Sequence, residues 1–262
     1  MSDALIEITD LAFAVDDKPI LRQVSLTVQA GEYVSIVGPN GAGKTTLIKC
    51  LGRIHRGWTG SIRIAGRPLQ AYGQKELARM LSYVPQAEGR SFPFTVEEFV
   101  LLARYPHLSP FTSVRAADRA AVADALAVTG VAELKDRALG TLSGGERQMV
   151  FVAAALAQGA RILLLDEPAT FLDYRHQADV MRLLKRVNRE SGITILSVNH
   201  NINSAAIWSD RIMAIKGGHS VFYGPPRDIL RRDVLEEIYE TPFQFIEHPE
   251  SPIPLAIAEG VS

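Results

Sequence analysis

The 262-residue sequence has one cysteine, almost no net charge and no long apolar run. A single cysteine excludes an intramolecular disulfide, and no spacing of cysteine and histidine residues suggests a zinc site. The net charge of −1 gives no reason to expect a nucleic-acid-binding surface. No apolar stretch approaches the ~20 residues that cross a bilayer, and residues 1–4 do not begin a secretory signal. We therefore expect a cytoplasmic globular protein whose link to any membrane comes through a partner.

Residues 38–46 have the spacing G-x-x-x-x-G-K-[ST] of a phosphate-binding loop. An apolar, β-rich run precedes them and a helix-like run follows, which is the strand–loop–helix context that the motif requires. Glycines allow backbone N–H groups to approach a polyphosphate, and a helix that begins near Gly43 points its positive dipole end at the same anion. Lys44 is then placed to reach the β- and γ-phosphates, and Thr45 to offer its hydroxyl to Mg²⁺.

Asp166 and Glu167 close a continuous apolar run at residues 161–166, which is typical of a strand buried on both faces of a parallel sheet. A carboxylate at the carboxyl end of such a strand, beside a phosphate loop, can hold Mg²⁺ directly or through water. A second carboxylate next to it can polarise a water for in-line attack on the γ-phosphate. The pair therefore predicts hydrolysis of a nucleoside triphosphate rather than nucleotide binding alone.

A second anion site is indicated at Ser143, Gly144 and Gly145, which precede an apolar helix predicted to begin near Arg147. A serine and two glycines at a helix N-terminus present unpaired amides to an anion. One domain with one nucleotide does not obviously need two phosphate cradles. Two molecules facing each other would, because each could close its second cradle on the other molecule's nucleotide.

Short runs of alternating apolar residues predict a small antiparallel sheet flanking the nucleotide core. They lie within residues 5–30, with a turn at 16–19, and at residues 61–66. The buried-strand run at 161–166 is followed by an amphipathic helix and a second such run at 193–198, which indicates a mostly parallel sheet. A hairpin is expected around the glycine pair that follows residue 216.

Strand patterns disappear from about residue 87 onwards. Thr95 and Glu98 form a capping box that predicts the start of a helix. Ser113 is expected to cap a second helix, which Gly130 ends. One face of that second helix is marked by apolar spacing at Val122, Ala125, Leu126 and Thr129. The segment is interpreted as an all-helical insertion.

Five motifs follow one another along the chain: the phosphate loop, Gln86, the Leu142-Ser143-Gly144-Gly145-Glu146 turn, the Asp166-Glu167 pair and His200. In this order they resemble the ATP-binding cassette family, and the resemblance covers about residues 5 to 240. Within the family, Thr95-Val96-Glu97-Glu98, Arg104-Tyr105-Pro106-His107 and the stretch 168–173 are similar to the ATPases of importers for iron-siderophores, haem and cobalamin.

The resemblance implies an α/β fold: a P-loop NTPase core with a mostly parallel sheet, a flanking antiparallel β-subdomain and an inserted all-helical subdomain. We expect residues 1–240 to form a single nucleotide-binding domain, with the helical subdomain at about 87–160. Four prolines after residue 240 lead us to expect an extended C-terminal tail at 241–262, lying over the surface.

The resemblance also implies roles for individual residues, with ATP and Mg²⁺ as cofactors. The Walker A loop that cradles the phosphates of ATP would comprise Gly38, Pro39, Asn40, Gly41, Ala42, Gly43, Lys44, Thr45 and Thr46. The metal ligands would be Thr45, Gln86 and Asp166. The catalytic residues would be Glu167 as general base, His200 as the switch histidine, Lys44 and Gln86. The signature that binds the γ-phosphate in trans would be Ser143, Gly144, Gly145 and Glu146, and the D-loop aspartate at the dimer seam would be Asp173.

Three positions depart from the family's pattern. Val15 stands where an aromatic residue usually stacks on adenine, with Phe13 two residues earlier, so either Phe13 substitutes or the adenine contact is weak and apolar. Position 201, commonly Asp, is Asn201, and Ala169 stands where Thr is frequent. Neither of the last two removes a catalytic group, so we expect hydrolysis to be retained.

The resemblance implies a homodimer of ATPase subunits at the cytoplasmic face of the inner membrane, held there by a multispanning permease dimer. A periplasmic or surface substrate-binding protein would be an indirect partner, and no nucleic acid is expected. Two alternatives stay open: a soluble non-transport ATPase of assembly or scaffold type, and an importer ATPase for another solute such as molybdate or zinc. The sequence does not name the substrate, because importer ATPases do not touch it.

Overall fold

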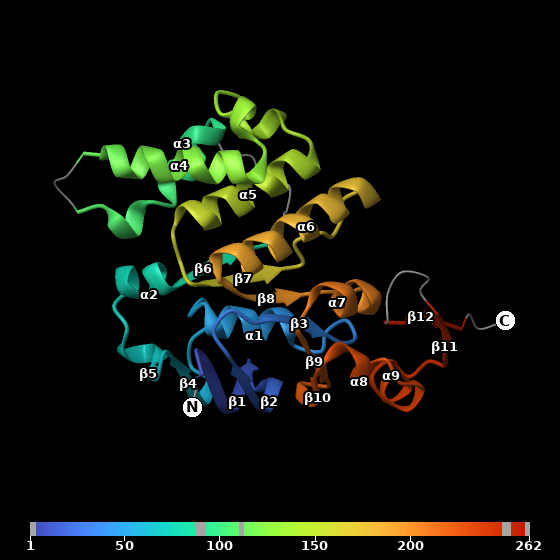
Figure 1. Cartoon of the computed structure of the whole chain (residues 1–262). Helices are drawn as coiled ribbons and strands as arrows, with labels where there is room; N and C mark the ends of the chain where they lie inside the picture. Colours follow the sequence, from blue (N-terminus) through green and yellow to red (C-terminus); the bar gives the residue numbers. More distant parts are fainter. Residues whose placement is uncertain (1–3, 87–92, 110–112, 248–252, 260–262) are drawn as a thin grey trace. The chain divides into compact units, whose positions relative to one another are not determined.

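The computed structural model describes residues 4–86, 93–109, 113–247 and 253–259. The chain folds into two compact units: residues 1–71 together with 194–262 form the first, and residues 72–193 form the second. Figure 1 shows the helices and strands of each unit along the chain.

The first unit contains the predicted antiparallel sheet. Strand β1 (Ile6–Val15) pairs with β2 (Lys18–Val28) on one side and with β4 (Thr59–Ile64) on the other. The short strand β5 (Arg67–Pro68), which continues into the 3₁₀ turn η1 (Leu69–Ala71), extends the sheet beyond β4. The turn between β1 and β2 is shorter than the predicted 16–19: it falls at residues 16–17, with both aspartates at positive φ, and Lys18 and Pro19 already belong to β2.

The first unit also contains parallel strands around β3 (Tyr33–Val37), which pairs with β8 (Thr194–Val198) and β9 (Arg211–Lys216). All residues of β3 and β8 are buried, which confirms the interpretation of continuous apolar runs as core strands. Strand β10 (His219–Gly224) turns back along β9 through the predicted glycine hairpin. Helix α1 (Lys44–Leu51) follows β3, and α7 (Ile202–Trp208) follows β8.

The C-terminal region is not the extended tail that the prolines suggested. After α8 (Pro226–Ile229) and α9 (Arg232–Tyr239), strands β11 (Phe243–Ile246) and β12 (Leu255–Ala258) pair antiparallel. Phe243 and Ala256 are buried in one cluster with residues of α7, β9 and α9. The Asn203 side chain binds the backbone of Ala256 in both directions, at 2.9 and 2.8 Å. Pro242 and Pro254 directly precede the two strands, which nevertheless pack on the core.

Replacement of Phe243 by alanine is expected to lower the free energy of unfolding by about 3 kcal/mol, because a 5% exposed ring leaves a cavity in the core. Ile246→Ala in the same strand is the matched control, since Ile246 is 51% exposed and its loss should change stability by less than about 0.5 kcal/mol. Urea unfolding followed by circular dichroism measures both. Equal, small effects would show that the hairpin does not pack on the core.

In the second unit, β6 (Leu81–Val84) and β7 (Ile162–Asp166) run parallel, with Val84 opposite Leu165. Helix α2 (Gln74–Met80) leads into β6, and the long helix α6 (Tyr174–Ser191) follows β7. Helix α6 is the predicted amphipathic helix, and its buried face includes Val180, Leu183, Leu184 and Val187. The two parallel strands therefore end at the same edge of this unit.

The rest of the second unit is helical, as predicted. Helices α3 (Val96–Leu102), α4 (Ala116–Thr129) and α5 (Gly144–Ala157) share one apolar core. The 3₁₀ turns between them are η2 (Tyr105–His107), η3 (Ala132–Leu134) and η4 (Leu139–Thr141). The capping box at Thr95 is present, and Gly130 ends α4 in the left-handed conformation.

Two helix starts differ from prediction. Helix α4 begins at Ala116 rather than after Ser113, because the Asp118 carboxylate accepts the backbone N–H of Arg115 at 3.1 Å and so caps the helix there. Helix α5 begins at Gly144 rather than near Arg147, since the Ser143 side chain already accepts the Glu146 N–H. In both helices a local side-chain bond to the backbone fixes the first turn.

Candidate functional site

The phosphate loop connects β3 to α1 within the first unit, and two of its glycines are required by their surroundings. A Cβ on Gly38, which has φ +136°, would lie 2.0 Å from the carbonyl oxygen of Ile215. A Cβ on Gly43, which has φ +104°, would lie 2.8 Å from the Leu21 side chain. Residues with side chains rarely adopt such φ values. The backbone of the loop therefore passes so close to its neighbours at Gly38 and Gly43 that only glycine fits there.

Lys44 is the first residue of α1 and is only 5% exposed. Its Nζ donates to the carbonyl oxygens of Gly38 and Pro39, both at 2.8 Å. The ammonium group therefore folds back along the loop instead of extending into solvent. A positive charge at this place adds to the positive end of the helix dipole. The loop thus carries a buried positive charge at the N-terminus of α1.

His200 lies at the same edge as the phosphate loop, because β8 runs parallel to β3 with Val198 opposite Ile36. The residue before it fixes this position: the Asn199 N–H donates to the Ile36 carbonyl at 3.0 Å, and its side-chain amide donates to Ser35 Oγ at 2.7 Å. Asn201 then caps α7 by accepting the N–H groups of Asn203 and Ser204. The change from Asp to Asn at position 201 therefore keeps the helix cap.

In the second unit, Gln86 and the Asp166-Glu167 pair lie at the shared end of the parallel strands β6 and β7. Gln86 Nε2 donates to Glu167 Oε2 at 2.8 Å. The Tyr83 hydroxyl donates to Asp166 Oδ2 at 3.2 Å, and Asp166 is 4% exposed. Glu167 has a left-handed backbone with φ +55°, a conformation that costs free energy in a residue with a side chain. The structure thus brings together the glutamine and the two acids that the sequence singled out.

The Ser143-Gly144-Gly145-Glu146 turn forms the N-terminus of α5. Glu146 Oε2 accepts the Ser143 N–H at 2.8 Å, and the Ser143 hydroxyl accepts the Glu146 N–H at 3.3 Å, which is a capping box. The Ser143 amide is the main group that lowers the pKa of the Glu146 carboxyl, and the Ser143 hydroxyl and Arg137 lower it further. The Glu146 side chain therefore holds the backbone of this turn in place.

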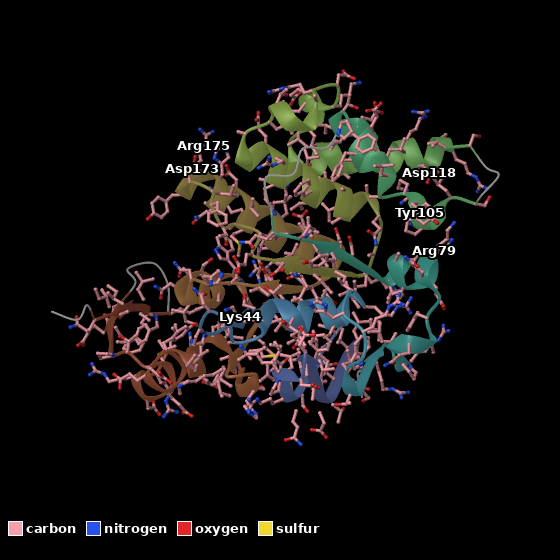
Figure 2. All side chains as sticks on the ribbon, turned by 180° about the vertical axis from the view of Figure 1, so that it is seen from behind. Lys44, Arg79, Tyr105, Asp118, Asp173 and Arg175 are labelled. Atoms are coloured by element: carbon pink, nitrogen blue, oxygen red, sulfur yellow. The ribbon has the colours of Figure 1, made fainter. Side chains whose placement is uncertain are left out.

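Asp173 precedes α6 and caps it. Its Oδ1 accepts the His176 N–H at 2.9 Å and lies 2.8 Å from His176 Nδ1. The backbone N–H of His176 is the largest influence that lowers the pKa of the Asp173 carboxyl. Asp173 is solvent-exposed at the first turn of α6, where Figure 2 labels it beside Arg175.

Comparison with known proteins decides the family. The family model described as ABC transporter matches residues 21–170, which is more than half of the chain. The chain belongs to the ABC transporter family. The match includes the phosphate loop, Gln86, the Ser143 turn and the Asp166-Glu167 pair, which lie between these bounds.

Two curated ABC proteins match almost the whole chain. The iron(3+)-hydroxamate import ATP-binding protein FhuC of Bacillus subtilis (strain 168) is 35% identical, over 94% of this chain and 92% of its own length. The hemin import ATP-binding protein HmuV of Streptomyces coelicolor (strain ATCC BAA-471 / A3(2) / M145) is 40% identical, over 89% and 82%.

A solved ABC structure shows the same fold. It is the ADP conformation of MJ1267, an ATP-binding cassette of an ABC transporter, with a TM-score of 0.80 at 21% identity, over 89% of this chain and 98% of that one. The predicted fold class, an α/β P-loop core with antiparallel and helical additions, is therefore confirmed.

Val15 stands at the position where ABC proteins usually have an aromatic residue that stacks on adenine. Phe13 stacks on His55, with 5.1 Å between ring centroids and 17° between ring planes. Burial lowers the pKa of the His55 imidazole, and the neighbouring Lys49 charge lowers it further. One face of the Phe13 ring is therefore covered, whereas Val15 is 47% exposed.

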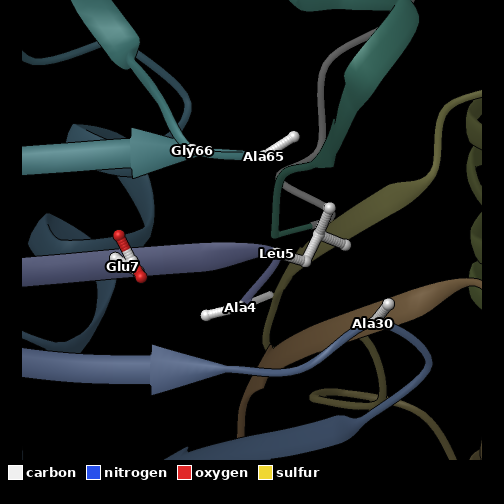
Figure 3. Close-up of a pocket in the computed structure, with 6 residues that line it drawn as sticks. All are labelled: Ala4, Leu5, Glu7, Ala30, Ala65 and Gly66. Carbon is white, nitrogen blue, oxygen red and sulfur yellow. The ribbon is translucent and has the colours of Figure 1, made fainter. Parts of the chain in front are cut away.

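The structure adds contacts that sequence analysis of this ABC protein missed. Tyr83 binds Asp166, Asn199 fixes His200, and His176 binds Asp173. Only Asn199 had a sequence signal, as the polar residue that ends an apolar strand. A hollow at the start of β1, lined by Ala4, Leu5, Glu7, Ala30, Ala65 and Gly66, carries a single titratable side chain (Figure 3). Among the described residues, no helix is long and apolar enough to cross a membrane.

Proposed function

We propose that this chain is the ATP-hydrolysing subunit of a membrane importer for an iron chelate, either an iron-siderophore or haem. The observation that carries the proposal is the identity of 35–40% over 89–94% of the chain to ATP-binding proteins named for ferric hydroxamate and hemin import. A match of this length includes every motif that the sequence singled out for nucleotide chemistry. Cobalamin, molybdate and zinc remain outcomes of the test below.

The residues present fit ATP with Mg²⁺. The loop of residues 38–46 ends in a buried lysine at a helix N-terminus, which is the arrangement that binds a polyphosphate. Thr45, Gln86 and Asp166 offer hydroxyl, amide and carboxylate oxygens, and Mg²⁺ prefers oxygen ligands. When bound, Mg²⁺ neutralises charge that develops on the β- and γ-phosphate oxygens.

Glu167 is proposed as the general base. Its carboxylate accepts a hydrogen bond from Gln86, which orients it, and its neighbour Asp166 is engaged by Tyr83. His200 is proposed to contact the γ-phosphate and the attacking water, and Lys44 to stabilise charge on the transferred group. Adenine has only the apolar surface of Val15 at its usual stacking position, so its contact is proposed to be weak and apolar.

The Ser143-Gly144-Gly145 turn is proposed to bind the γ-phosphate held by a second copy of the chain. A homodimer would then enclose two nucleotides, with Asp173 at the seam. Because ATP binds the closed dimer more tightly than the open one, its binding shifts the population towards closure. Hydrolysis removes the γ-phosphate contact and allows the dimer to reopen.

The proposed location is the cytoplasmic face of the inner membrane, with the chain held by a permease dimer. The helical insertion, predicted at about 87–160 within a nucleotide-binding domain of residues 1–240, is proposed to grip a cytoplasmic helix of each permease subunit. A periplasmic or surface binding protein would deliver the substrate to the other side.

The test is ATPase activity of the complete transporter in proteoliposomes. A permease and a binding protein, sought among the neighbouring reading frames, are purified with this chain, and the binding protein is loaded in turn with a ferric hydroxamate, hemin, cobalamin, molybdate or zinc. We expect a ferric siderophore or hemin to raise ATP turnover several-fold over the unloaded binding protein. Stimulation by molybdate or zinc alone would overturn the substrate class. The absence of any permease that co-purifies would favour the soluble alternative.

A further inference from the structure

The second glycine of the Ser143 turn is packed against a histidine from another helix. A Cβ added to Gly145 would lie 2.3 Å from Cδ2, 2.6 Å from Cγ and 3.0 Å from Nε2 of His176, and these are its three nearest atoms. Gly145 is buried in α5 and has ordinary helical φ. The need for glycine at this position within the chain therefore comes from the His176 ring and not from backbone strain.

The same ring is held from its other side by Asp173. The Asp173 carboxylate binds both the backbone N–H and the Nδ1 of His176, at 2.9 and 2.8 Å. The His176 ring thus touches the Ser143 turn with its carbon edge while its Nδ1 is engaged by the loop before α6. Leu172 supports the contact, because a Cβ on Gly144 would lie 3.7 Å from its Cδ2. All of these residues belong to the second unit.

Two aromatic side chains at the start of α6 are also highly exposed: Phe171 in the loop before the helix and Tyr174 in its first turn. Phe171 is 85% exposed with φ +64°, and Tyr174 is 91% exposed. Exposed aromatic residues of this size are enriched where a protein meets a partner. Phe171 lies two residues before Asp173, and Tyr174 lies two residues before His176, so the histidine connects this exposed apolar segment to the signature turn.

We infer that His176 is a positioning residue that ties the Asp173 loop to the Ser143-Gly144-Gly145 turn, so that both meet the second copy of the chain as one rigid surface. The inference rests on the proposed function, because only the proposed function involves a second copy of the chain. A side chain that holds another group in place reduces the conformational freedom of that group before binding, so less entropy is lost when the partner binds. Loss of His176 should therefore weaken ATP-dependent closure without changing nucleotide binding by the open chain.

The first experiment tests the contact within one chain. Gly145→Ala should lower the midpoint of thermal unfolding, because its methyl group collides with the His176 ring, whereas Gly144→Ala, the matched control, should not. The double variant Gly145→Ala with His176→Ala should regain most of the loss, because the ring is gone. A double variant as unstable as Gly145→Ala alone would overturn the contact. This result does not depend on any nucleotide or partner.

The second experiment tests positioning, in a Glu167→Gln background that holds ATP-bound dimers. The concentration of ATP that gives half-maximal dimer by analytical ultracentrifugation should rise about tenfold with His176→Ala. His176→Asn, whose amide can replace Nδ1 as the donor to Asp173, should restore most of the affinity. Fluorescent ATP binding to the monomer at low protein concentration should be unchanged in both.

The outcomes separate the inference from the proposed function. If the Glu167→Gln chain dimerises with ATP and His176→Ala does so equally well, the inference is wrong and the proposed function stands. If the Glu167→Gln chain does not dimerise at any ATP concentration, the dimer proposal fails first. If His176→Ala also weakens ATP binding by the monomer, the residue acts in folding and not in positioning.

Discussion

Replacement of Glu167 by glutamine is expected to lower ATP turnover by about 10²–10³-fold, because the amide cannot accept the proton of the attacking water. The variant changes little else. Gln86 Nε2 donates to Glu167 Oε2, and a glutamine carbonyl oxygen can accept the same hydrogen bond. ATP should therefore still bind, and the closed dimer should accumulate because its γ-phosphate is not removed. Phosphate release at saturating ATP measures the first effect, and size-exclusion chromatography with ATP and Mg²⁺ measures the second.

Lys44→Ala is the contrasting variant. It removes a buried cation from the phosphate loop, where it bonds Gly38 and Pro39, so it should abolish dimer formation as well as hydrolysis. A Glu167→Gln chain that hydrolyses ATP within about threefold of the natural rate would eliminate Glu167 as the base. A chain that loses both hydrolysis and ATP binding on Glu167→Gln would assign the residue to binding instead.

Replacement of Arg104 by alanine is expected to cause the largest loss of stability among single polar substitutions in the second unit. Arg104 Nε donates to Asp118 Oδ1 at 3.0 Å, and its NH1 group donates to the Ala157 carbonyl at 2.6 Å. The side chains of Arg104 and Asp118 are only 13% and 6% exposed. Removal of one partner leaves a carboxylate enclosed without its counter-charge. We expect the midpoint of thermal unfolding to fall by roughly 5 °C or more.

The effect should extend to the signature turn, because Ala157 is the last residue of α5 and the Ser143 turn is its beginning. His107 of the same motif binds the next carbonyl, Gln158 O, at 2.8 Å. The Gln158 amide in turn donates to Leu81 O at 2.9 Å, at the start of the strand that leads to Gln86. Figure 2 labels Arg79, Tyr105 and Asp118 around this motif. The Arg104–His107 motif therefore holds the C-terminal end of α5, and Gln158 at that end connects it to β6.

Two controls make the Arg104 result specific. Arg182→Ala removes an exposed pair with Asp179 on α6, whose side chains are 63% and 36% exposed, and should leave the unfolding midpoint unchanged. Arg104→Lys keeps the charge but cannot serve both acceptors from one planar group, so it should recover only part of the loss. Equal midpoints for Arg104→Ala and Arg182→Ala would show that the enclosed pair does not stabilise the unit.

The sequence predicted features of the fold that depend on neighbouring residues. The turn that begins at Asp16, the capping box at Thr95 and the end of α4 at Gly130 are local, and all three are confirmed. The C-terminal hairpin was missed, because β11 and β12 pair across a gap of eight residues and are held by Asn203, some fifty positions earlier. The nearby prolines indicated an extended tail, but the distant contact with Asn203 outweighs this local preference.

At the site, the features that the sequence could predict are those that follow from the parallel arrangement of the strands. Residues that follow parallel neighbours must end at one edge, so Gln86 could be expected near Asp166 and Glu167, and His200 near the phosphate loop. The Tyr83 contact with Asp166 could not, since it depends on the register that places Tyr83 opposite Leu164. The His176 ring depends likewise on how α5 meets α6. The catalytic roles themselves stay predictions until the variants above are measured.

The bond between Asn203 and Ala256 has a consequence for how this protein is handled. Asn203 belongs to the first turn of α7, three positions after the histidine that is proposed to sense the γ-phosphate. A protein shortened after its last nucleotide motif, or carrying a bulky tag close behind residue 258, would release that turn from its brace. Ala256, which lies far along the chain from every nucleotide motif, therefore helps to hold the turn that follows His200 in place.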